Sequence, residues 1–240
     1  MKSRPLLLLS FCLLALTAWS QSTATDESIY SRSATSIWAL RGATVPSPDG
    51  KKAIVIKPPE NPSSYETHTV LIRSGRHVYR TRIGALVNAE VAWSPDSKAF
   101  FVTYSDGGNV GTYHVRVVYV TDSGIRAIEP LPNGRRLFKP ICFDPENPNV
   151  GAIGWIGNGS DQLAIAVEVP PHSSCASMGT FKAFVIQLPT GNVVSTYGQI
   201  EAKRSFSKLI GSELRGADDT CVEEPRSCVP CGMKGVECGP

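Results

Sequence analysis

Beyond its first twenty residues, the sequence has no long apolar run and almost no net charge. Without such a run, we expect no membrane span in the mature chain. The formal charge is +3, and it falls to +1 when Lys2 and Arg4 are left out. A nearly neutral chain has no electrostatic basis for binding nucleic acid or an anionic membrane.

The sequence is also poor in signals of catalysis. It contains no Gly-x-Ser-x-Gly nucleophile elbow. Its four histidines lack the spacing of metal ligands: His68, His77, His114 and His172. We therefore predict no catalytic residue, no metal site and no cofactor. A Ser–His–Asp triad assembles from distant positions, so a small hydrolase stays open as an alternative.

The N-terminus reads as a secretory signal peptide over residues 1–20. Lys2 and Arg4 precede an apolar stretch, and small residues at Ala18 and Ser20 suit cleavage before Gln21. Residues 21–35 are rich in Ser, Thr and Ala, which predicts a flexible leader. The mature chain is thus expected to be secreted or periplasmic.

Three stretches of the chain repeat one plan: an Asp-centred turn, a strand-like run, and a hairpin that reverses at a Gly. With one strand before each turn, every unit counts four strands. The first two turn aspartates are 47 residues apart. A four-stranded repeat of this length is typical of a propeller blade. The residues predicted to shape the turns are Asp49, Asp96, Asp161, Gly75, Gly124 and Gly191.

Other segments fit this plan less closely. A first strand is expected over residues 36–42, and an inserted loop over residues 140–148. In the run from Val115 to Val120 only Arg116 is polar, which predicts a strand in a sheet covered on both faces. Residues 200–214 have apolar side chains three and four apart, which favours a helix but also suits a closing strand.

The segments Ser-Pro-Asp-Gly-Lys at 47–51 and Trp-Ser-Pro-Asp-Ser-Lys at 93–98 resemble the blade motif of TolB-like and WD-like bacterial β-propellers. The same motif precedes the catalytic domain of prolyl-oligopeptidase-type hydrolases. The resemblance covers residues 36–200 and includes no hydrolase domain. It implies that the turn residues are structural: Pro presets the turn and Asp accepts hydrogen bonds from the following amides.

We therefore predict an all-β fold: a propeller-like array of four-stranded antiparallel meanders, about three blades, over residues 36–212. An irregular, Cys-rich tail is expected over residues 213–240. Propellers generally close with at least four blades. Three alternatives follow: a degenerate fourth unit, a homodimer that completes the ring, or an incomplete array with covered edges.

Six cysteines follow the signal peptide, and an even number in an exported chain favours disulfides. For the tail, with its central Cys228-x-x-Cys231, we favour two disulfides; a zinc site and a redox pair are alternatives. Cys142 and Cys175 form another potential pair. The disulfide candidates are Cys142, Cys175, Cys221, Cys228, Cys231 and Cys238.

These observations predict an exported, non-catalytic scaffold that binds another protein or a cell-envelope component. Loops at the blade ends are the expected contact surface, because rigid sheets position them. The candidate loops are residues 58–66, 106–112 and 170–180. The alternative is a small exported enzyme, either the hydrolase named above or a thiol–disulfide oxidoreductase that uses Cys228 and Cys231.

Overall fold

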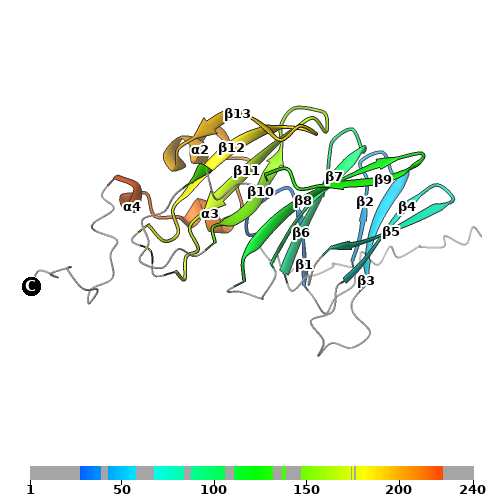
Figure 1. Ribbon diagram of the computed structural model, residues 1–240, viewed down its shortest axis with the longest axis horizontal. Coiled ribbons are helices and arrows are strands. Elements are labelled where there is room, and N and C mark those ends of the chain that lie inside the picture. The colour runs from blue at the N-terminus through cyan, green and yellow to red at the C-terminus, as the bar shows by residue number, and fades with distance from the viewer. Residues whose placement is uncertain are drawn as a thin grey trace, which may run out of the picture.

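The computed structural model describes residues 28–38, 43–57, 68–83, 88–105, 111–131, 137–138, 147–173, 175 and 177–223. In these residues, thirteen strands form three antiparallel sheets, and three short helices follow them. Figure 1 shows the sheets one after another along the long axis, with the helices at one end. The predicted all-β, propeller-like array of three meanders is confirmed, and the sheets do not close into a ring.

Each sheet is a meander of strands that are consecutive in the chain. The first sheet has the order β2-β3-β4-β5, from β2 (Ala43–Pro46), β3 (Lys52–Lys57), β4 (His68–Ser74) and β5 (His77–Ile83). The third has the order β10-β11-β12-β13, from β10 (Asn149–Trp155), β11 (Gln162–Glu168), β12 (Phe181–Gln187) and β13 (Asn192–Tyr197).

The middle sheet has a fifth strand at one edge. Its meander consists of β6 (Asn88–Trp93), β7 (Ala99–Ser105), β8 (Tyr113–Thr121) and β9 (Gly124–Ile128). The extra strand, β1 (Thr35–Trp38), pairs antiparallel with β6. A first strand was expected over residues 36–42; its described part joins the second unit rather than the first.

Side chains of the middle sheet are buried on both faces. Every residue of β6 and β7 is buried, as expected for strands whose residues are mostly apolar on both faces. One face packs on the first sheet, through Ile54, Ile72, Val91, Phe100 and Val118 among others. The opposite face packs on the third sheet, through Phe101, Val117, Leu163, Ile165 and Phe184 among others.

Equivalent tryptophans connect successive sheets. Trp93 ends β6, and its indole N–H donates to the carbonyl oxygen of Val45 in β2 at 3.0 Å. Trp155 ends β10, and its indole N–H donates to the carbonyl oxygen of Ala92 in β6 at 3.2 Å. Each bond joins the first strand of one four-stranded meander to the first strand of the meander before it, so the stacking register repeats.

Helices cover the outer face of the third sheet. Three described helices follow this sheet, α2 (Gln199–Ser205), α3 (Ser212–Gly216) and α4 (Thr220–Glu223), and the first two supply buried side chains to this layer. The 200–214 segment is therefore helical rather than a closing strand. Phe206, Ile210 and Leu214 are buried against Ile153 and other apolar side chains of this sheet. None of these helices is long and apolar enough to cross a membrane.

Residues 28–34, which we call the N-terminal strap, bind the third sheet and the helices together. Tyr30 is 1% exposed and its ring lies over Gly151 of β10. The Gly211 amide donates to the Tyr30 carbonyl oxygen at 2.9 Å, and Ser31 forms a β-bridge with Ile210. The described strap is therefore packed where a flexible leader was expected over residues 21–35. At the other end, buried Leu214 lies beyond the expected domain boundary at residue 212.

The close approach of Tyr30 to Gly151 gives a prediction. A Cβ at position 151 would overlap the Tyr30 ring, so Gly151→Ala should displace the strap and lower the free energy of unfolding by about 2–3 kcal/mol. Gly198→Ala is the matched control, because nothing lies within 4 Å of a Cβ there. Urea unfolding measures both.

A double-mutant cycle checks the cause. In a Tyr30→Ala background the ring is gone, so adding Gly151→Ala should cost little further stability. Equal costs with and without the ring would contradict the overlap.

Candidate functional site

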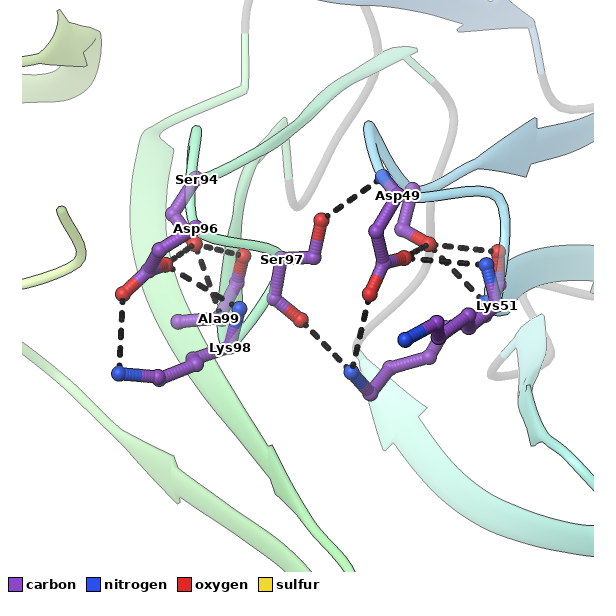
Figure 2. Close-up of polar contacts among 9 residues, drawn as sticks. Asp49, Lys51, Ser94, Asp96, Ser97, Lys98 and Ala99 are labelled. Carbon is purple, nitrogen blue, oxygen red and sulfur yellow. Dashed lines mark hydrogen bonds and ion pairs between the residues drawn. The ribbon is translucent and has the colours of Figure 1, made fainter. Parts of the chain in front are cut away.

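The first two predicted turns share one hydrogen-bond pattern (Figure 2). In the first, the Ser47 hydroxyl donates to Asp49 Oδ1 at 2.6 Å, and the Lys51 amide donates to the same oxygen at 3.0 Å. In the second, the Ser94 hydroxyl and the Lys98 amide donate to Asp96 Oδ1 at 2.6 and 3.2 Å.

The hydrogen bonds of the first turn also affect the pKa of its aspartate. The hydrogen bond from Ser47 and the Lys51 amide hold the pKa of Asp49 below its ordinary value, since both bonds favour the ionised carboxylate.

These turns are bonded to one another across sheets. Ser97 Oγ accepts a hydrogen bond from the Asp49 amide at 3.1 Å, and Lys52 Nζ donates to the Ser97 carbonyl oxygen at 3.1 Å (Figure 2). Ser97 has φ +59°, the left-handed conformation that Gly50 adopts in the first turn. The Ser160 hydroxyl of the third turn donates to Asp96 Oδ2 at 3.1 Å.

The third turn is built differently. Its closing bond runs from the Ile156 amide to the Gln162 carbonyl oxygen, one residue longer than the bond from the Ser94 amide to the Ala99 carbonyl oxygen. Asp161 lies directly before β11, and its backbone carbonyl oxygen accepts from the Leu188 amide at 2.7 Å. Asp161 is therefore not equivalent to Asp96, contrary to the expected repeat.

The three hairpin glycines do occupy similar places. Gly75 and Gly191 lie between the last two strands of their sheets, Gly124 begins the last strand of its sheet, and their φ values are +56°, +78° and +155°. These values lie in the region that favours glycine, as the predicted reversals require.

Two buried carboxylates lie beneath the strap. Glu90 accepts hydrogen bonds from three consecutive amides, those of Ile29, Tyr30 and Ser31. Burial raises the pKa of Glu90 to about 7, although these three bonds oppose the shift. The Tyr30 hydroxyl donates to Glu168 Oε2 at 2.5 Å.

Glu168 is the more strongly perturbed of the two. Burial raises its pKa to about 8, and the nearby Glu213 adds to the increase. A carboxylate that must lose its hydration in this way favours its neutral form.

The carboxylate pair was missed in the sequence, although a signal was present. Glu90 lies among the apolar residues of β6 and Glu168 ends the apolar run of β11, and both side chains prove buried, at 3% and 1% exposure. A lone carboxylate in such a strand must find polar partners, because an unpaired buried charge is costly. Their partners in the strap lie about sixty residues from Glu90 and 138 residues from Glu168 along the chain, beyond the reach of local pattern analysis.

The outer face of the first sheet differs from that of the third sheet because no described helix or strand packs on it. Successive side chains of a strand point to opposite faces of the sheet. Ile54, Ile56, Val70 and Ile72 lie on the face that packs into the core. The opposite face has no layer over it among the described residues. We call it the open face, and its described members are Thr44, Pro46, Ala53, Val55, Lys57, Thr69, Leu71, Arg73, Val78 and Arg80.

The histidines lie apart from one another. His68 belongs to β4, and His77 stacks on Tyr79 in β5 with ring centroids 6.1 Å apart. His114 in β8 lies beside Tyr104, and His172 is exposed in a turn. In the part of the chain that the structure describes, no three His, Cys, Asp or Glu side chains are grouped for a metal ion.

The cysteines and the candidate loops are described only in part. Cys175 is buried and disulfide-bonded. The other candidate cysteine side chains, those of the Cys228-x-x-Cys231 motif included, lie outside the described residues. So do the 58–66 loop and most of the 106–112 loop. Most of the 170–180 segment is described, and it turns at Pro170–Ser173 and again before Thr180.

Comparisons with known proteins leave the family open. No family model matches the chain, and no curated protein matches it. Among solved structures, TolB from Acinetobacter baumannii matches with a TM-score of 0.34 and 19% identity, over 66% of this chain and 33% of that one. The chain thus spans about a third of that protein's length. Nothing is inferred from a likeness at this level, and the fold is described from the three sheets of this chain.

The turn network predicts unequal roles for two aspartates. Asp96→Ala removes the acceptor of the Ser94, Lys98 and Ser160 bonds, so it should lower the free energy of unfolding by about 1–2 kcal/mol. Asp161→Ala, the control, should cost less than about 0.5 kcal/mol. Urea denaturation followed by tryptophan fluorescence compares them, and equal losses would argue against the bonded turn.

The buried carboxylates predict a pH dependence. Their pKa values are raised on folding, so the folded state holds protons that the unfolded chain releases above about pH 4.5. The free energy of unfolding should therefore fall between pH 5 and pH 9, by roughly 6 kcal/mol for the two groups together, since each unit of pKa shift corresponds to about 1.4 kcal/mol.

Two variants test whether the buried carboxylates cause this fall in the free energy of unfolding with pH. Glu168→Gln cannot titrate and should flatten it, whereas Glu129→Gln should leave it unchanged, because Glu129 is 59% exposed. Unfolding curves at several pH values provide the test. Stability that stayed constant over this range would show that both carboxylates are ionised in the folded protein, as in the unfolded chain.

Proposed function

We propose that this protein is an exported, non-catalytic interaction module that binds another protein through its open face. The observation that supports this most is the contrast between the two ends of the array. Helices and the strap cover the outer face of the third sheet. The described residues place nothing over the corresponding face of the first sheet.

The apolar members of the open face support this proposal. Val55 and Leu71 pair across the central strands and are only half-buried, and Val78 is 59% exposed. In a stack of sheets, such positions are those that an added layer would bury. A partner could therefore gain hydrophobic contact without rearrangement of the first sheet.

The proposal includes export to the periplasm or the cell exterior, as the N-terminal residues 1–20 suggest. The disulfide at Cys175 fits an oxidising compartment. The proposed partner is a protein, and proteins of the cell envelope are included.

Site-specific photo-crosslinking tests the binding surface. A photoreactive amino acid at Val78 should form an intermolecular crosslink in extracts of the cells that produce the protein. The same group at Val194 should not, although Val194 is 53% exposed on β13 of the third sheet. Val194 is the matched control because it is an exposed valine at similar accessibility. Equal crosslinking at both positions, or none at Val78, would overturn the proposal.

A further inference from the structure

Basic side chains are concentrated in the segment that forms the first sheet. Residues 43–83 contain seven Lys or Arg and three Asp or Glu, whereas residues 84–240 contain thirteen and sixteen. The nearly neutral charge of the whole chain therefore conceals a positive first sheet and a slightly negative remainder. Such an asymmetry influences which surfaces approach each other.

Part of this charge lies on the open face. In the strand register Leu71 is opposite both Val55 and Arg80, and Arg73 is opposite both Ala53 and Val78. Exposed arginines thus alternate with half-buried apolar side chains along neighbouring strands. The described members of the open face include no carboxylate, so no acidic side chain among them offsets these arginines.

We infer that the open face binds an acidic protein surface in which apolar side chains lie between carboxylates. This inference rests on the proposed function and adds the chemistry of the partner. The apolar centre would be buried under the partner's apolar side chains, and the arginines would meet carboxylates, to which a guanidinium can donate two parallel hydrogen bonds.

Other partners fit this face less well. A second copy docked face to face would bring arginine rows together, which is repulsive. An anionic membrane calls for apolar side chains that protrude, but Val55 and Leu71 are half-buried. Single-stranded nucleic acid calls for rings on which bases stack, and the described members of the open face have no aromatic side chain.

A defined probe tests the chemistry. The probe is a fluorescein-labelled twelve-residue peptide of alternating Glu and Leu, and its counterpart alternates Lys and Leu. Fluorescence anisotropy with the full mature chain should show binding of the acidic peptide only, and the binding should weaken as salt is raised.

Charge variants locate the binding. Arg73→Glu combined with Arg80→Glu should weaken binding of the acidic peptide at least tenfold, and Arg73→Gln with Arg80→Gln should weaken it less. The control is Arg126→Glu, an exposed arginine on β9 of the middle sheet, which should change it less than twofold. Circular dichroism of each variant verifies the fold, and the neutral Gln pair keeps the test valid if the Glu pair unfolds.

The contrary outcomes are specific. Equal binding of the two peptides, no loss in the Arg73/Arg80 variants, preferential binding to phosphatidylglycerol vesicles or to oligo-dT, or a dimer by light scattering that the Glu pair leaves intact would each overturn the inference. If Val78 still crosslinks a partner protein while the arginine variants bind it unchanged, the acidic chemistry fails and the proposed function stands. Absence of crosslinking at Val78 removes the proposed function itself.

Discussion

The arrangement of the layers in this protein follows from one constraint: the apolar side chains on both faces of a sheet must be covered. A four-stranded meander with apolar side chains on each face is not stable in water unless another layer covers them. The middle sheet meets this condition with one neighbour on each side, which is why every residue of β6 and β7 is buried. The third sheet meets it with helices and the strap, and the first sheet meets it on one face only.

Specific polar bonds then fix how the layers align. Apolar packing is largely non-directional, so it sets which faces meet but not their register. The indole bonds of Trp93 and Trp155 and the links between turns supply that register, and both lie where the first strand of a meander runs into its turn. Glu90 does the same for the strap, since three successive amides fit one carboxylate in one position only.

Local chemistry made much of this predictable from the sequence. The turns at Asp49 and Asp96 were visible because Ser-Pro-Asp acts over a few residues, and the strands were visible from their alternation. Asp161 was misaligned because the repeat was counted from aspartates, whereas the turn is set by the pairing of β10 with β11. The pairing of β1 with β6, the burial of Tyr30 and the carboxylate cluster depend on contacts between distant residues, which no local pattern contains.

The capped third sheet has a consequence for assembly. A stack of like sheets with both end faces bare could add copies head to tail without limit, as open-ended fibres do. A further copy of the chain that approached the third sheet would contact α2, α3 and the strap instead of a bare sheet. At this end the described residues leave no bare sheet face on which another copy could stack head to tail.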